Sequence, residues 1–204
     1  MKTFSIIGDS YSTFEGWVLE GNACYYPKPE KVDDVLRVED TWWHQLMRRT
    51  GMELILNDSY SGSTVCTDVR DGRPDSSAFV KRVKYYFSGA NQADYIFVFG
   101  GTNDSGLERS VGQVKFSERT EEDLKQVLPA YCEVLEYLLQ CNPKSKVIAL
   151  VNTGLKPDIH EGICSAAAHY GVTAVVLENI DKQNGHPSAA GMRQIADQIE
   201  AVLK

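Results

Sequence analysis

Residues 95–104 read YIFVFGGTND, a run of five apolar residues followed by two glycines and three polar residues. An unbroken apolar run rich in β-branched and aromatic side chains predicts a strand that is covered on both faces, as strands of parallel sheets are. The two glycines predict a sharp exit from that strand. This stretch therefore indicates an α/β fold with a buried parallel sheet.

Similar runs occur on both sides of this strand and alternate with longer helix-like segments. The alternation is typical of βα units and predicts one parallel sheet of five strands. The predicted strands are Thr3–Ile7, Glu53–Leu56, Tyr95–Phe99, Lys146–Val151 and Thr173–Leu177. Two connections, 11–39 and 102–119, are too long for simple turns and follow carboxyl ends of strands, where open α/β sheets bind ligands.

Five segments between and after the strands have helical spacing and recognisable ends. Asp40 is expected to cap the first of these helices, which stops at Gly51. Thr120 and Asp123 resemble a capping box, and Pro129 is expected to kink or divide the helix that follows them. The predicted helices cover residues 41–50, 76–87, 120–138, 158–170 and 188–203.

Length and composition favour one globular domain over residues 1–204, since 204 residues with 43% apolar content can bury a sizeable core. The formal net charge of −7 argues against nucleic acid as a partner, because binding to nucleic acid requires Lys and Arg to neutralise phosphates. No apolar run approaches the ~20 residues that cross a bilayer, so we expect no membrane partner. The expected partner is a small-molecule substrate.

The five cysteines form no CxxC pair and lack the Cys/His spacing of a zinc site, so we expect free thiols and no metal. Their odd number favours a reducing compartment. The chain opens MKTFSIIGDS, in which a short apolar run leads into a turn and not into a signal-peptide pattern. These features predict a cytoplasmic protein, with a secreted or periplasmic location as the alternative if a signal peptide has been removed.

Four short polar segments lie at carboxyl ends of predicted strands or before the last helix, where the fold can bring them together. Taken alone, the third of them is as typical of an ordinary turn as of a site, and the other three are more typical of ordinary turns, loops or surface residues. They are Gly8-Asp9-Ser10 after the first strand, 59–64 with Gly62 after the second, Gly101-Thr102-Asn103-Asp104 after the third, and 184–188 with His186 before the last helix.

The residue types in these segments fit nucleophilic attack on an acyl group. Gly8 gives the backbone freedom that a tight turn often needs, so the hydroxyl of Ser10 can point into a cleft. His186 precedes a proline, which holds it extended at a loop edge, where it can serve as a general base. A glycine N–H in the second segment and the amide of Asn103 can donate hydrogen bonds to an oxyanion.

In this order, the four segments resemble the motif blocks of the SGNH (GDSL-type) hydrolases, from residue 8 to residue 187. The resemblance implies a flavodoxin-like, three-layer α/β/α sandwich and a serine esterase that needs no cofactor. It implies that Ser10 is the nucleophile and His186 the general base. It also implies an oxyanion hole made by the N–H groups of Ser10 and Gly62 and the side chain of Asn103.

One position departs from the family pattern. The family usually has an aspartate three residues before the histidine, where it orients the imidazole, and this chain has Gln183 there. Asp181, five residues before His186, is the acidic candidate for that role. Alternatively, Gln183 or a backbone carbonyl orients Nδ1, and the enzyme works as a dyad whose imidazolium is stabilised less than it would be by a carboxylate.

The resemblance leaves the substrate open among short acyl esters, O-acetyl groups of carbohydrates, lysophospholipids and thioesters. Aromatic residues in the 11–39 connection favour carbohydrate slightly. The alternative from another class is a non-catalytic member of the fold that binds a small molecule or a carbohydrate, which the missing aspartate supports. A flavodoxin-like nucleotide binder is a further alternative, although no helix start follows the first strand directly.

Two further groups of residues are expected to have structural roles or to lie at the surface. Tyr25 and Tyr26 are expected to pack the long 11–39 connection onto the domain. Arg70 and Arg73 lie just after the Gly62 segment and could meet an acidic group of a substrate, but solvated surface charges are the favoured interpretation.

Overall fold

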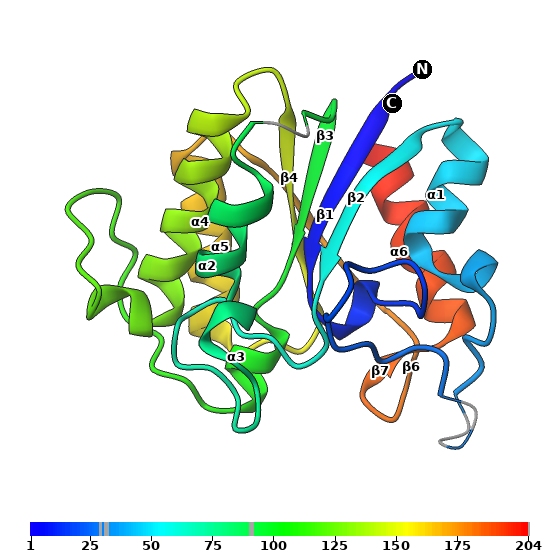
Figure 1. Cartoon of the computed structure of the whole chain (residues 1–204), viewed down its shortest axis with the longest axis horizontal. Coiled ribbons are helices and arrows are strands. Elements are labelled where there is room, and N and C mark those ends of the chain that lie inside the picture. Colours follow the sequence, from blue (N-terminus) through cyan, green and yellow to red (C-terminus); the bar gives the residue numbers. More distant parts are fainter. Residues whose placement is uncertain (29, 31–32, 90–91, 204) are drawn as a thin grey trace.

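A five-stranded parallel sheet in the order β2-β1-β3-β4-β5 forms the centre of the molecule (Figure 1). The computed structural model describes all residues except 29, 31–32, 90–91 and 204. The strands are β1 (Thr3–Gly8), β2 (Glu53–Ser59), β3 (Tyr95–Phe99), β4 (Lys146–Val151) and β5 (Thr173–Val176). All neighbouring strands pair in parallel, and the order 2-1-3-4-5 is that of flavodoxin-like folds.

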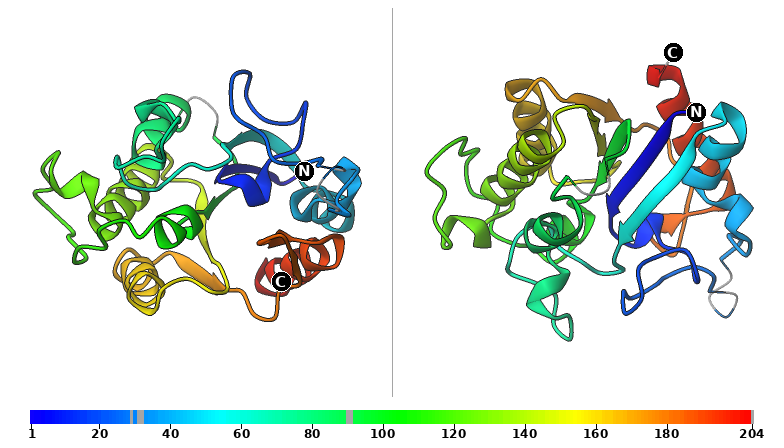
Figure 2. Two further views of the ribbon diagram at one scale, coloured as in Figure 1. Left: turned by 90° about the horizontal axis from the view of Figure 1, so that it is seen from below. Right: turned by 45° about the horizontal axis from the view of Figure 1, so that its top comes forward.

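Helices cover both faces of the sheet (Figures 1 and 2). The α-helices are α1 (Trp42–Thr50), α2 (Phe79–Tyr86), α3 (Thr102–Gly106), α4 (Val127–Cys141), α5 (Pro157–His169) and α6 (Ala189–Leu203). Helices α1 and α6 lie on one face, and α2, α4 and α5 lie on the other. The predicted three-layer α/β/α sandwich with a five-stranded parallel sheet is thus confirmed.

The side chains of β3 explain why its sequence is apolar at every position. Ile96 and Val98 belong to the core beneath α2, α4 and α5, whereas Phe97 and Phe99 belong to the core beneath α1 and α6. All four are buried. Since successive side chains of a strand point to opposite faces, a strand between two helical layers has no face for polar residues.

The ends of α1 and α6 show how local sequence sets helix boundaries. The first cap differs from the expected one, because Thr41 Oγ1, and not Asp40, accepts the N–H of His44 at 3.3 Å. Asp40 belongs to a 3-10 turn that comes before the helix. Ser188 caps α6, since its Oγ accepts the N–H of Gly191 at 3.1 Å.

The expected kink at Pro129 is wrong. The hydroxyl of Thr120 and the carboxylate of Asp123 do accept each other's backbone N–H, but they begin a 3-10 turn over Asp123–Lys125. The helix α4 starts later, at Val127. Pro129 therefore lies in the first turn, where an N–H would have no intrahelical partner and a proline costs nothing.

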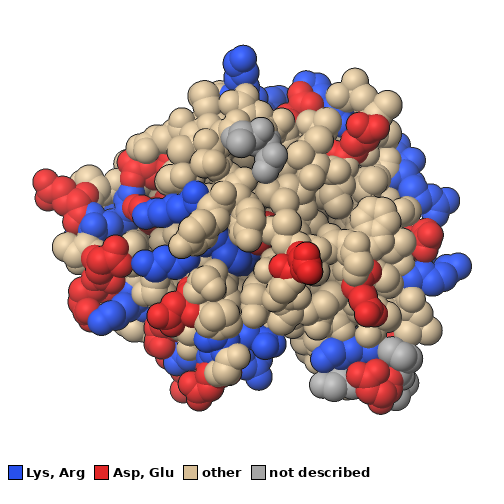
Figure 3. All heavy atoms as spheres, in the orientation of Figure 1, with Lys and Arg blue, Asp and Glu red and all other residues tan. Residues whose placement is uncertain are grey.

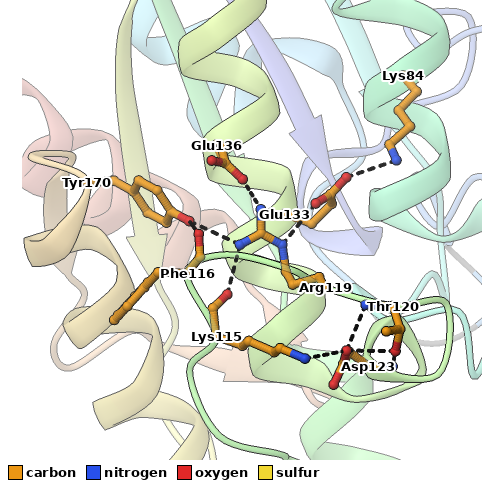
Figure 4. A network of polar contacts seen from close by, with 9 residues as sticks. All are labelled: Lys84, Lys115, Phe116, Arg119, Thr120, Asp123, Glu133, Glu136 and Tyr170. Carbon is orange, nitrogen blue, oxygen red and sulfur yellow. Dashed lines mark hydrogen bonds and ion pairs between the residues drawn. The ribbon is translucent and has the colours of Figure 1, made fainter.

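The connection between α3 and α4 is held against the helices by Arg119, whose side chain is only 4% exposed (Figure 4). Its guanidinium donates to Glu133 Oε2 at 2.9 Å, to the carboxylate of Glu136 and to the carbonyl of Lys115 at 2.8 Å. The ring of Phe116 stacks on His169 of α5 with centroids 3.6 Å apart. These contacts give a long connection a fixed path.

The start of β1 and the end of α6 lie beside each other, at the edge of the sheet opposite the carboxyl ends of the strands (Figure 1). Met1 and Leu203 line the same shallow surface hollow. Among the described residues, none of the helices is both long enough and apolar enough to cross a membrane. The five cysteines are free, as their spacing predicts.

Candidate active site

The carboxyl ends of three adjacent strands bring the first three predicted segments together. Strand β1 lies between β2 and β3. Ser10 follows β1, Gly62 follows β2 and Asn103 follows β3. Because the strands are parallel, the three residues leave the sheet at the same edge.

Ser10 begins a 3-10 turn over Ser10–Ser12 and is 5% exposed. The carboxylate of Asp9 caps this turn by accepting the N–H of Tyr11 at 3.0 Å. The expected backbone freedom of Gly8 is not used for a positive φ, and the glycine is instead needed for space, because a Cβ there would lie 2.6 Å from Ser59 Oγ. Burial raises the pKa of Asp9 to about 7, against the lowering effect of the Tyr11 N–H.

His186 lies on a separate two-stranded antiparallel hairpin of β6 (Lys182–Gln183) and β7 (His186–Pro187). Asn184 and Gly185 form its two-residue turn with φ of 49° and 77°. The hairpin was not predicted, although Asn-Gly is the sequence preferred where both turn residues need positive φ. It places His186 Nε2 at 2.9 Å from Ser10 Oγ.

The structure places a backbone carbonyl at the other nitrogen of the imidazole. His186 Nδ1 lies 3.2 Å from the carbonyl oxygen of Asn184. The carboxylate of Asp181, the acidic candidate, instead accepts the hydroxyl of Ser188 at the start of α6. Gln183 Oε1 is buried and has no hydrogen-bond partner within the described part of the chain. The geometry therefore matches the dyad alternative, in which a carbonyl faces Nδ1.

Three tyrosines surround His186, and sequence reasoning missed this. The ring of Tyr25 stacks on the imidazole with centroids 3.5 Å apart and an interplanar angle of 9°. The hydroxyls of Tyr11 and Tyr26 donate to the carbonyls of Gly185 and Pro187 at 2.7 Å each. The two residues flanking His186 are thus both fixed. Tyr25 and Tyr26 do pack the long connection, as expected, but onto the hairpin of the histidine.

Burial keeps these hydroxyls protonated. It raises the pKa of Tyr25 to about 12, with a further contribution from the nearby carboxylate of Asp33. Burial also raises the pKa of Tyr11 and of Tyr26 well above the ordinary tyrosine value. The tyrosines therefore act as hydrogen-bond donors and as an aromatic wall, and not as acids or bases.

The two other expected oxyanion donors follow the strands on either side of β1, the strand that leads to Ser10. Asn103 lies on α3, and its Nδ2 donates to the carbonyl of Ser63 at 2.9 Å, which leaves its second N–H available. Gly62 has a φ of 82°, a conformation that favours glycine. Among the described residues, no acceptor takes the backbone N–H of Ser10 or of Gly62.

Two buried charged residues join the loops at the end of the sheet, a role that was not predicted for either of them from the sequence. Arg82 of α2, 3% exposed, donates to the carbonyl of Gly8 at 3.0 Å and pairs with Asp58 at 2.8 Å. Asp104 accepts the N–H of Val65 at 3.0 Å. For Arg82, the sequence does contain an indication of this role, since a cation stands among the apolar residues that form the buried face of the helix.

Together these groups can carry out acyl transfer. A hydroxyl within hydrogen-bond distance of an imidazole can lose its proton to it during attack on a carbonyl. Backbone N–H groups without acceptors can stabilise the negative oxygen that results. Among the described residues, no group of three or more His, Cys, Asp or Glu side chains is arranged to hold a metal ion.

Comparison with known proteins identifies the family. Residues 2–203 match the family model described as GDSL-like Lipase/Acylhydrolase. A protein described as a GDSL-like lipase, from Bacteroides ovatus, is 35% identical with a TM-score of 0.92, covering 100% of this chain and 98% of its own. A similarly described protein from Bacteroides uniformis is 37% identical with a TM-score of 0.92, and the match covers 99% of this chain and 95% of that one.

A more distant solved structure, the aryl esterase of M. smegmatis, is 15% identical with a TM-score of 0.69, and the match covers 100% of this chain and 98% of that one. At this identity the likeness shows the fold alone. No curated protein matches the sequence. The match of one family model to nearly the whole chain, with two close structural relatives, shows that the chain belongs to the family of GDSL-like lipases and acylhydrolases.

Proposed function

We propose that this protein is a serine esterase that hydrolyses short acyl esters through an acyl-enzyme on Ser10. The observation that carries the proposal is the 2.9 Å contact between Ser10 Oγ and His186 Nε2. A hydroxyl held against an imidazole nitrogen, beside backbone N–H groups that have no acceptor, is the arrangement that ester hydrolysis needs. Family membership supports hydrolysis as the general class of reaction.

In the first half of the proposed reaction, Ser10 Oγ attacks the ester carbonyl and His186 Nε2 takes the hydroxyl proton. The negative oxygen of the tetrahedral intermediate accepts hydrogen bonds from the N–H groups of Ser10 and Gly62 and from Asn103 Nδ2. His186 then gives its proton to the departing alkoxide, and the alcohol leaves. In the second half, a water loses its proton to His186, attacks the acyl group and releases the acid and Ser10.

In this proposal, a backbone carbonyl and an aromatic ring take part in orienting His186. The carbonyl of Asn184 accepts from Nδ1 and selects the tautomer with Nε2 as the base. A carbonyl stabilises an imidazolium less than a carboxylate would. The face of the stacked Tyr25 ring adds an attraction for the positive charge that forms on the imidazole during each half of the reaction.

The proposal is tested by hydrolysis of 4-nitrophenyl acetate, butyrate and octanoate, with an O-acetylated sugar, a lysophospholipid and a thioester as further substrates. We expect turnover of the short esters by the wild type and a loss of at least about 1,000-fold in Ser10→Ala. Ser76→Ala, an exposed serine on a 3-10 turn, is the matched control. Equal activity in Ser10→Ala would refute the assignment of the nucleophile. Ligand binding without turnover would instead favour a non-catalytic member of the family.

A further inference from the structure

Two arginines on the loop after β2 lie against Gly62, one of the proposed oxyanion donors. A Cβ on Gly62 would lie 3.0 Å from Arg73 Nε, 3.4 Å from Arg73 Nη2 and 3.6 Å from Arg70 Cδ. The absence of a side chain on the glycine is what allows a guanidinium to come so close. Arg73 is half-buried there, so its expected role as a solvated surface charge is wrong, whereas Arg70 is exposed.

The local backbone holds the two arginines together. The N–H of Arg73 donates to the carbonyl of Arg70 at 2.9 Å, which closes a turn containing Gly72 at a φ of 76°. The guanidinium carbon of Arg73 lies 5.6 Å from the ring centroid of Tyr60, the residue that follows β2. The side chain of Arg73 is therefore positioned between an aromatic ring and Gly62 before any ligand binds.

Both positive charges lack a carboxylate partner within the described residues. Asp71 and Asp75 belong to the same loop, yet neither forms an ion pair with Arg70 or Arg73. The nearby carboxylate of Asp68 pairs with Arg109 instead, at 3.4 Å.

Arg73 Nε is buried and, within the described part of the chain, donates to no acceptor. A buried cationic donor that lacks an acceptor is rare and costly, so such a group marks a place where a ligand can supply the oxygen.

This arrangement stands out against the charge of the whole molecule. The net charge is −7, so the protein as a whole repels anions. Figure 3 shows Lys and Arg side chains interspersed with Asp and Glu along the lower edge of the molecule, the edge where the strands end and the loop after β2 lies in Figure 1. Attraction of a negative group to the site must therefore come from local positive charge.

Resting on the proposed function, we infer that Arg70 and Arg73 form a subsite for an anionic group of the ester substrate. Guanidinium groups bind carboxylate and phosphate through paired, charge-assisted hydrogen bonds. Because the subsite adjoins Gly62, the anionic group lies a few bonds from the scissile carbonyl, in either the acyl or the alcohol part. The natural substrate class is thus an ester that carries a carboxylate or a phosphate.

Matched pairs of esters test this inference. The acyl pair is 4-nitrophenyl hydrogen succinate and its neutral methyl ester, and the alcohol pair is 4-acetoxyphenyl phosphate and neutral 4-methoxyphenyl acetate. We expect the ratio of kcat/KM for the anionic over the neutral ester to fall about 10-fold in Arg73→Met and less in Arg70→Met. Arg73→Lys should keep part of the ratio, and added salt should lower it in the wild type.

The control is Arg48→Met, which removes an exposed arginine on α1 and should leave both rates unchanged. The pair that shows the preference tells whether the anion belongs to the acyl or the alcohol part. A ratio that is the same in the wild type and in Arg73→Met for both pairs would overturn the inference.

A binding measurement separates this inference from the proposed reaction. Ser10→Ala is titrated with glutarate and with phenyl phosphate, and the backbone amide of Gly62 is followed by NMR. We expect its resonance to shift, and to stop shifting when Arg73→Met is added to Ser10→Ala. Shifts in Ser10→Ala, combined with a wild type that hydrolyses none of the esters, would keep the subsite and refute the esterase. Ester hydrolysis without such shifts would keep the esterase and refute the subsite.

Discussion

In the wild type, the free energy of unfolding should fall as the pH rises from about 5 to 7. Replacing Asp9 by Asn should remove this dependence on pH. The Asp9 carboxyl is fully buried, and burial raises its pKa from 3.8 to about 7. Between these values, the folded protein holds a proton that the unfolded chain has released, so stability falls as pH rises. The slope is about 1.4 kcal/mol per pH unit, which amounts to about 3 kcal/mol between pH 5 and pH 7.

The assay is urea unfolding of the wild type and Asp9→Asn at half-unit steps from pH 5 to pH 8. Asparagine has nearly the same shape, and its oxygen can still accept the N–H of Tyr11. Other titrating groups cancel in the difference between the two proteins. This difference should move by about 3 kcal/mol in favour of Asp9→Asn as pH rises, and level off above pH 7. Two parallel pH profiles would refute the reasoning.

Two other predictions concern Arg82 and the surroundings of His186. Arg82→Met should lower the free energy of unfolding by about 3–5 kcal/mol because it leaves the buried carboxyl group of Asp58 without its cationic partner. Arg82→Met with Asp58→Asn should recover part of this loss, and a loss below about 1 kcal/mol in urea unfolding would contradict the prediction. Tyr25→Leu should lower kcat about 10-fold, whereas Tyr25→Phe, which keeps the stacked ring, and Asp181→Asn should each change kcat less than about 3-fold. A larger loss in Asp181→Asn than in Tyr25→Leu would return the orienting role to the carboxylate.

The strands were predictable where burial alone decides the sequence. The bounds of β3 and β4 agree with prediction because every position is apolar or lies at the strand end. Strand β2 continues three residues past its predicted end at Leu56, through Asn57, Asp58 and Ser59. In the sequence, such a run of polar residues predicts a loop. They are buried in the strand because Asn57 donates to the carbonyl of Ser12 at 2.9 Å and Asp58 pairs with Arg82.

The part of the candidate site that could be predicted is the part whose residues directly follow the ends of strands. Ser10, Gly62 and Asn103 leave the sheet at the same edge because three adjacent parallel strands end there, a consequence of topology. What faces Nδ1 of His186 depends on the geometry of one two-residue turn, which periodicity does not reveal. The stacking of Tyr25 depends on how a long connection folds across the molecule, and no local pattern encodes that path.

The adjacent ends of β1 and α6 make this chain suitable for circular permutation. A short glycine-rich linker could join them at the edge of the sheet that is remote from Ser10 and His186 (Figure 1). New termini could then be opened in an exposed turn such as 20–21, which carries no buried side chain. The rearranged chain would carry Ser10 and His186, the proposed nucleophile and base, near one another in the order of synthesis, whereas 175 residues separate them in the present order.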